Sequence, residues 1–220
     1  GVATANLVLP DVPTSDNQTY QPIKAEPPAG CGDCHGEKLG QWRASMHAAA
    51  AVDPWVFDLY DGSGTPATGG NGYVYTSSHP AGSTGTCAVC HTPTANPRDA
   101  GSVMLNAVTS ASGLEGVTCS ACHQLAAVDG PVNALHLMGG ARVFFPGVNG
   151  SATTHDYVWG PLPDSTAPAM ETMYAPWIAE SRFCASCHEY DNPDTGAPGQ
   201  RTYSEWLASA YAQPGAGYRS

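Results

Sequence analysis

Residues 31–35 read CGDCH, residues 87–91 read CAVCH, residues 119–123 read CSACH and residues 184–188 read CASCH. These four C-x-x-C-H motifs, called first to fourth below, contain all 8 cysteines of the chain. The pattern is typical of a c-type haem site, where two thiols bond to the porphyrin and the adjacent histidine binds the iron. Because no cysteine is left over, the sequence predicts four covalently bound haem c groups.

Each motif supplies two attachment cysteines and one proximal iron ligand. The predicted attachment residues are Cys31, Cys34, Cys87, Cys90, Cys119, Cys122, Cys184 and Cys187. The predicted proximal ligands are His35, His91, His123 and His188. A disulfide framework or two four-cysteine zinc sites would leave these histidines unexplained. A thioredoxin-like site would need one such motif beside a βαβ pattern, which the sequence lacks.

Four further histidines match the number of distal iron positions. They are His47, His79, His136 and His155, which complete the 8 histidines of the chain. We therefore predict that all four irons have two histidine ligands. Methionine is the competing distal ligand and raises the reduction potential relative to histidine. The 5 methionines follow no comparable pattern, and methionine commonly fills gaps in a core.

His47 has the strongest support among the distal candidates. It lies in EKLGQWRASMHAAAAV (37–52), which is rich in good helix formers. Trp42 and Met46 are four residues apart on the expected helix and are predicted to pack on a porphyrin while His47 points at an iron. The other three candidates lie in less regular stretches, SSHPAG (77–82), NALHLMGG (133–140) and ATTHDY (152–157).

The composition is unusual for a globular protein. Leu, Ile, Val and Phe make up 32 of the 220 residues, which is too few for a large core of side chains. Only 12% of the residues are charged, however, and this is too few for a typical disordered chain. We expect large apolar cofactors to supply much of the core. The net charge of −11 with 8 Lys and Arg argues against nucleic-acid binding, and no apolar run is long enough to span a membrane.

The predicted fold class is mainly irregular, with short α-helices and minimal β-structure, the polypeptide being wrapped around a chain of four haems. The 25 glycines and 19 prolines interrupt the sequence throughout. Short helices are expected at the four motifs, at about 37–51 and at about 202–212. Short strands are expected around 73–76 and 141–145, and loops at 63–72, 80–86 and 191–199.

We expect two segments in the domain organisation. Residues 31–220 form a single tetrahaem c-type cytochrome domain, because no linker separates two independent cores. Residues 1–30 hold no haem motif and five prolines, and are predicted to be an extended N-terminal arm, either disordered or crossing a neighbouring subunit. Asn17 and Asn149 begin N-glycosylation sequons, and the sequence does not say whether either is glycosylated.

A second repeat accompanies the haem motifs. Residues 39–48 read LGQWRASMHA and residues 203–212 read YSEWLASAYA, which share the frame W-x-A-S-x-(H/Y)-A. With C-x-x-C-H and the block GVTCSACH (116–123), this frame resembles the multihaem cytochromes of the c554 type. Four haem motifs in 220 residues, TYSEWLASAYA near the C-terminus and the proline-rich arm are similar to the OmcE-type extracellular tetrahaem cytochromes.

This resemblance implies a filament subunit at the cell surface or outside the cell. The OmcE-type proteins polymerise and conduct electrons along a continuous haem chain, with one iron ligated by a histidine of the adjacent subunit. Here no histidine follows His188, and Tyr211 stands where the first repeat has His47. The fourth haem is therefore the expected recipient of a distal histidine from upstream in the chain or from another chain, in a homopolymer with head-to-tail contacts.

The predicted function is electron transfer to redox partner proteins or extracellular acceptors, without substrate chemistry. A soluble periplasmic tetrahaem shuttle would have nearly the same sequence features. A multihaem reductase would need an iron with an open position, which the histidine count disfavours, and the chain has no C-x-x-C-K variant. Tyr211 keeps this third alternative open, because a site that lost its histidine would be open to a substrate.

Overall fold

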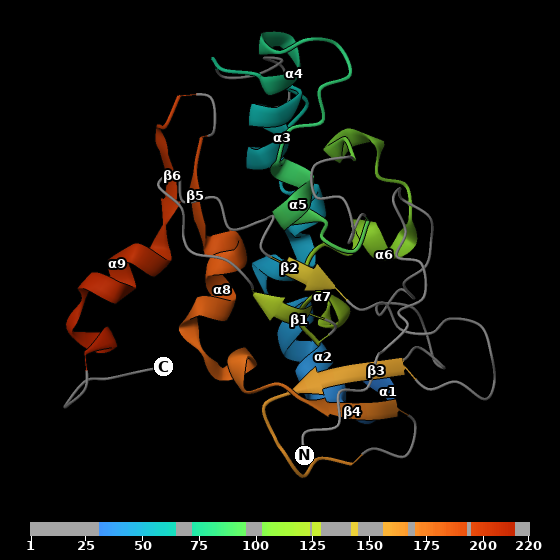
Figure 1. The fold of residues 1–220 in the computed structure, drawn as a ribbon. Coiled ribbons are helices and arrows are strands. Elements are labelled where there is room, and N and C mark those ends of the chain that lie inside the picture. Colours follow the sequence, from blue (N-terminus) through green and yellow to red (C-terminus); the bar gives the residue numbers. More distant parts are fainter. Residues whose placement is uncertain are drawn as a thin grey trace.

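The structure is a computed structural model that describes residues 31–64, 72–95, 103–123, 125–128, 142–144, 156–166, 170–192 and 195–213. Short helices joined by irregular segments dominate these residues, and their strands form two-stranded sheets (Figure 1). This architecture confirms the predicted fold class. Among the described residues, no helix is long and apolar enough to cross a membrane. The N-terminal arm lies outside the described residues, and the single domain stays a prediction.

The cysteine pair of every C-x-x-C-H motif lies on a helix, as predicted. The helices are α1 (Cys31–Cys34), α5 (Cys87–His91), α7 (Cys119–His123) and α8 (Ser181–His188). His35 of the first motif lies between α1 and α2 (Gly36–Arg43). The C-x-x-C spacing places two residues three apart on one helix face, so both thiols can reach the same partner.

The two helices predicted from the W-x-A-S frame form, but each is divided at its serine. The first comprises α2 (Gly36–Arg43) and the 3₁₀ helix η1 (Met46–Val52), and the second comprises α9 (Thr202–Ala208) and η5 (Ala210–Ala212). The Ser45 hydroxyl donates to the Trp42 carbonyl at 2.7 Å, and the Ser209 hydroxyl donates to the Trp206 carbonyl at 2.6 Å. The backbone ψ is extended at both serines, 160° at Ser45 and 165° at Ser209, so the chain leaves the α-helix there. The serine hydroxyl meanwhile donates to a carbonyl that the end of the helix leaves without an amide partner.

The sheets are small and confirm one of the two strand predictions. β1 (Leu125–Val128) pairs antiparallel with β2 (Arg142–Phe144), the strand predicted around 141–145. β3 (Asp156–Gly160) runs parallel to β4 (Met170–Tyr174), and β5 (Glu189–Asp191) runs antiparallel to β6 (Pro198–Arg201). Residues 80–86 form the predicted loop. The loop predicted at 191–199 is shorter than expected, because β5 ends at Asp191 and β6 begins at Pro198.

The strand predicted around 73–76 is wrong, because the chain forms α4 (Tyr75–Ser78) there. The Tyr75 ring stacks on Tyr60, with centroids 5.7 Å apart, and on His79 at 4.0 Å. The Tyr75 carbonyl also lies 3.0 Å from His79 Nδ1. One helical turn brings residues 75 and 79 onto the same face, so aromatic packing overrides the alternating pattern of the sequence.

The remaining helices of the described part are α3 (Pro54–Tyr60), η2 (Leu105–Ala107), α6 (Ala111–Leu114) and η4 (Pro176–Ala179). The core between the described elements is small. Tyr60, Ala88 and Leu105 form one buried cluster. In Figure 1, α3, α4 and α5 lie towards one end of the molecule, α1, β3 and β4 towards the other, and α8, α9, β5 and β6 along one side.

Candidate haem sites

All eight motif cysteines belong to the described part of the chain, and none of them forms a disulfide there. No three of the described His, Cys, Asp or Glu side chains gather so as to hold a metal ion. Burial raises the pKa of the Cys87 and Cys184 thiols, so these surroundings favour neutral sulfur, as in a thioether.

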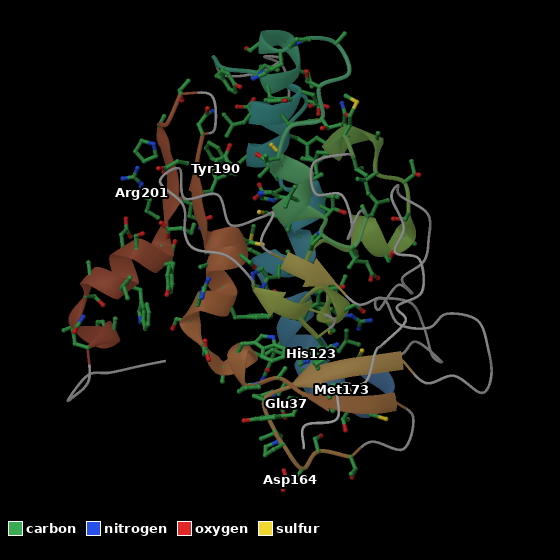
Figure 2. The ribbon with its side chains drawn as sticks, in the orientation of Figure 1. Glu37, His123, Asp164, Met173, Tyr190 and Arg201 are labelled. Carbon is green, nitrogen blue, oxygen red and sulfur yellow. The ribbon has the colours of Figure 1, made fainter. Side chains whose placement is uncertain are left out.

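Three of the four motif histidines have a partner close to Nδ1. The Ala50 carbonyl lies 3.0 Å from His91 Nδ1. The Trp159 carbonyl of β3 lies 2.8 Å from the Nδ1 of His123, the histidine labelled in Figure 2. A carbonyl can only accept, so Nδ1 is the donor in both contacts, and a neutral imidazole that donates from Nδ1 has its lone pair on Nε2. That tautomer is the one that binds a metal through Nε2.

The fourth motif differs in using a side chain. The Gln200 amide lies 2.9 Å from His188 Nδ1. Gln200 is in β6, opposite Tyr190 in β5, so the strand pairing sets its position relative to His188. Sequence analysis found none of these Nδ1 partners, because a backbone carbonyl can come from any residue and Gln200 belongs to no motif.

The W-x-A-S-x-H frame and the G-V-x-C-x-x-C-H block interlock. The Trp42 indole donates to the Val117 carbonyl at 2.7 Å, and the Val117 amide donates to the His47 carbonyl at 2.9 Å. Gly116 has φ +76°, and a Cβ there would lie 2.5 Å from the His47 carbonyl oxygen. The block therefore needs a glycine where it meets η1, both for its backbone conformation and for the close approach.

His47 and His188 are brought together although they are far apart in the sequence. Their ring centroids are 6.1 Å apart, with an angle of 53° between the ring planes. Trp42 and Met46 were expected on one helix, but they lie on two. The chain leaves α2 after Arg43, and Met46 begins η1. Met46 is 68% exposed.

An apolar cavity of about 400 Å³ lies beside the fourth motif. Cys184, Ala185 and His188 of α8 line it together with Tyr203 and Trp206 of α9. The Tyr203 and Trp206 rings stack with centroids 5.7 Å apart. A thiol, an imidazole and two aromatic faces around one apolar cavity fit a porphyrin attached at this motif.

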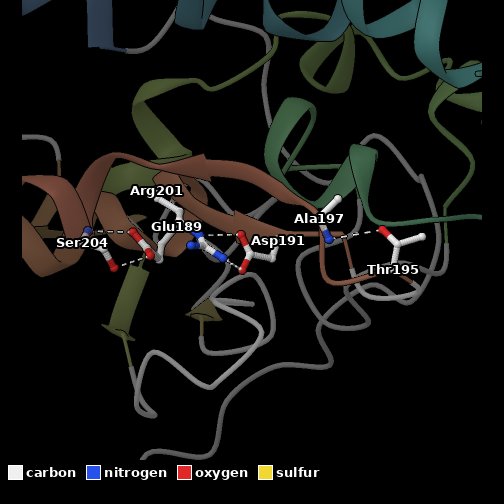
Figure 3. A network of polar contacts seen from close by, with 6 residues as sticks. All are labelled: Glu189, Asp191, Thr195, Ala197, Arg201 and Ser204. Carbon is white, nitrogen blue, oxygen red and sulfur yellow. Dashed lines mark hydrogen bonds and ion pairs between the residues drawn. The ribbon is translucent and has the colours of Figure 1, made fainter.

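Polar contacts hold α9 next to the fourth motif (Figure 3). The buried Glu189 carboxylate accepts hydrogen bonds from the Ser204 amide at 2.9 Å and the Ser204 hydroxyl at 2.6 Å, in the first turn of α9. The buried Asp191 accepts two hydrogen bonds from Arg201, at 2.9 and 2.6 Å, which raise the pKa of Arg201. Because Glu189 directly follows His188, these contacts fix the cavity wall relative to the proximal histidine.

The remaining predicted ligands are less defined by contacts. His35 is exposed and directly precedes α2. His79 is half-buried, with its Nδ1 next to the Tyr75 carbonyl, which again leaves Nε2 as the nitrogen that could bind a metal. His136 and His155 lie outside the described residues. Met104 packs against the cluster around Tyr60, which supports core filling for that methionine.

No protein-family model matches the chain, and no curated protein matches it. Among solved structures, it is similar to a penta-heme cytochrome c552 from Thermochromatium tepidum, with 25% sequence identity and a TM-score of 0.53. The similarity supports a multihaem c-type cytochrome. It covers 86% of this chain and 52% of the other, so the chain spans about half the length of that cytochrome.

Proposed function

We propose that this multihaem cytochrome transfers electrons through four haem c groups, each with two histidine ligands, and is not an enzyme. The observation that carries the proposal is the placement of all four C-x-x-C cysteine pairs on helices, with acceptors next to the Nδ1 atoms of His91 and His123. Each thiol would add across a vinyl group, forming a C–S bond and passing its hydrogen to the adjacent vinyl carbon. The bound haems would supply the one-electron iron couple.

The protein's own residues would set the properties of that couple. Two histidines per iron keep the potentials below those of His/Met cytochromes. They also leave no coordination position for a substrate, which favours outer-sphere electron transfer over reductase chemistry. His91, His123 and His188 lie at helix ends with a partner at Nδ1, which would keep their imidazole orientation fixed as the iron changes charge.

We further propose that the chain is a subunit of an extracellular filament, with periplasmic shuttling as the alternative. The support is the likeness of its repeat, motif count and N-terminal arm to the OmcE-type proteins. A head-to-tail contact that does not close into a ring generates an open filament, and a histidine–iron bond across it would fix subunit orientation. Redox proteins or extracellular acceptors would take the electrons.

We propose that a haem other than the fourth takes a histidine from the neighbouring subunit. The contact between His47 and His188 within one chain supports a distal ligand for the fourth haem from the same chain. His79 follows α4, which lies at one end of the molecule (Figure 1), and is the stronger candidate donor among the described histidines. A structure of the polymer in which every iron–histidine bond lies within one chain would contradict the cross-chain bond.

Intact-mass spectrometry of the denatured protein tests the proposed cofactor content. We expect the mass of four covalently bound haems, and electron paramagnetic resonance of the oxidised protein should show low-spin iron only. Fewer than four haems would contradict the proposal, and carbon monoxide binding to the reduced protein would favour a reductase. Electron microscopy of the same preparation should show filaments, whereas a monomer at every concentration would favour the shuttle.

A further inference from the structure

We propose that His47 and His188 are the two axial ligands of one haem, the one attached at Cys184 and Cys187, within a single chain. The inference rests on the proposed haem attachment and adds which distal histidine serves which motif. It assigns the histidine of the first W-x-A-S repeat to the motif that precedes the second repeat.

The distance between the two rings matches shared ligation of one metal. A metal–imidazole bond is about 2 Å long and an imidazole centroid lies about 1 Å from its nitrogens, so two imidazoles on opposite faces of one metal have centroids about 6 Å apart. The centroids of His47 and His188 are 6.1 Å apart. The 53° between their planes is compatible with this, because each ring can rotate about its own bond to the metal without changing the centroid distance.

Hydrogen bonds and close packing fix the backbone of His47 in the fold. Its carbonyl accepts the hydrogen bond from Val117, whose own carbonyl accepts from Trp42, and Gly116 lies directly against it. The His47 side chain is exposed, whereas Ala48, Ala50 and Ala51 of the same helix are buried. A fixed backbone with an imidazole directed away from the core is what a distal ligand needs.

The opposing histidine is held as firmly. His188 ends α8, its Nδ1 lies against Gln200, and the Glu189–Ser204 contacts hold α9 beside it. Cys184 and His188 also line the 400 Å³ cavity, so the thiol, the proximal imidazole and the space for a large apolar group coincide.

The pairing explains the tyrosine of the second repeat. Tyr211 follows Ser209 in the same local geometry that places His47 after Ser45, and its side chain is 60% exposed. Because the haem of the fourth motif already has His47, position 211 does not have to supply a ligand. Tyr211 is therefore not the mark of an open iron.

The pairing also connects the second and fourth motifs through η1. This helix carries His47 and, three residues later, the Ala50 carbonyl that accepts from His91. A 3₁₀ helix rises about 2 Å per residue, so the two positions are about 6 Å apart along its axis. The second and fourth haems would thus share one supporting helix.

Spin state gives a direct test on the holoprotein. His47→Ala should convert one of the four haems from low spin to high spin and permit carbon monoxide to bind one iron per chain after reduction. Tyr211→Ala changes the equivalent position of the other repeat and should leave all four haems low-spin. His47→Met, which keeps a sixth ligand, should restore low spin and raise the potential of one haem.

A second set of variants identifies the haem concerned. Cys184→Ala with Cys187→Ala removes the fourth attachment site, and adding His47→Ala should then leave the spectrum of the three remaining haems unchanged. In a chain with Cys31→Ala and Cys34→Ala, His47→Ala should still produce one high-spin haem. A new high-spin haem from His47→Ala in the chain lacking the fourth site would overturn the pairing.

The outcomes separate this inference from the proposed function. Four haems by mass with all irons still low-spin in His47→Ala would reject the pairing alone. Fewer than four haems in the unmodified protein would reject the proposed function itself. Loss of filaments together with one high-spin haem in His47→Ala would place His47 in a neighbouring chain and overturn the inference.

Discussion

At the scale of single residues, the motif histidines differ in what lies next to Nδ1. His91 and His123 face backbone carbonyls, whereas His188 faces the side chain of Gln200. An acceptor at Nδ1–H makes an imidazole a stronger donor to its metal. Ligation through Nε2 puts the proton on Nδ1, so the Gln200 amide would present Oε1 there rather than its nitrogen. The backbone acceptors cannot be changed by substitution, but Gln200 can.

We predict that Gln200 sets the reduction potential of the fourth haem. Gln200→Leu removes the acceptor, weakens donation from His188 to the iron and should raise one of the haem potentials. Gln200→Glu offers a stronger, charged acceptor and should lower the same potential. Spectroelectrochemical titration measures both shifts.

Gln41→Leu is the matched control for these variants. Gln41 is an exposed glutamine whose amide contacts Glu37 and Lys38, so this substitution should leave all potentials unchanged. Shifts of the same sign from Gln200→Leu and Gln200→Glu would contradict the proposed role of the hydrogen bond.

At the scale of elements, η1 is the connection between motifs that are distant in sequence. It contacts α2, α5 and α6, and its backbone meets the segment that leads into α7. Its buried residues are alanines, which keep the approaching backbones close. The tightest approach is Gly116, where a Cβ would lie 2.5 Å from the His47 oxygen and 3.1 Å from the Ala50 amide nitrogen.

We predict that Gly116→Ala destabilises the holoprotein by displacing η1. The added methyl group clashes with the backbone of the helix, and overpacking of this kind costs roughly 1–3 kcal/mol beyond the cost of the left-handed backbone. Gly82→Ala separates the two effects, because Gly82 also has positive φ, +87°, but faces open space. Its cost should be that of the backbone alone, about 1 kcal/mol.

Thermal unfolding of the two variants checks this expectation. Gly116→Ala should also increase the high-spin fraction of one haem, because the His47 backbone moves with η1, whereas Gly82→Ala should not. Equal losses of stability in both variants would mean that the contact between Gly116 and η1 is not tight in solution.

At the scale of the whole molecule, the protein side chains form little core. Eight of the thirteen buried hydrophobic residues in the described part are alanines, and Tyr60 and Leu105 are the largest of those that are fully buried. Alanine removes little apolar area from water, so these contacts offset only a small part of the conformational entropy lost on folding. Beside Cys184, helices α8 and α9 line an apolar cavity that a large apolar group would fill.

We predict that the chain does not fold without haem. Replacing all eight motif cysteines by alanine should give an unfolded or rapidly degraded protein, because the remaining apolar contacts are too few. Circular dichroism and limited proteolysis measure this against the holoprotein. A compact variant with a cooperative thermal transition would show that the side chains suffice.

The sequence by itself determined the proposed chemistry of the sites and the class of the fold. C-x-x-C-H is a local pattern, and local patterns fix which residues share a helix turn. The cysteine pairs of all four motifs lie on helices. The 25 glycines and 19 prolines likewise predicted a mainly irregular chain. The helix at Tyr75 was missed because stacking on Tyr60 comes from a distant segment.

Only the tertiary structure decided which sites belong together. The sequence left the fourth motif without a downstream histidine, and spacing could not say which upstream residue reaches it. His47 lies beside His188 because two hydrogen bonds hold η1 in place. Trp42 donates to the Val117 carbonyl, and the Val117 amide donates to the His47 carbonyl. These bonds use backbone carbonyls and the space left by a glycine. A backbone carbonyl is the same in every residue, so its partner is fixed by the path of the chain and leaves no pattern in the sequence.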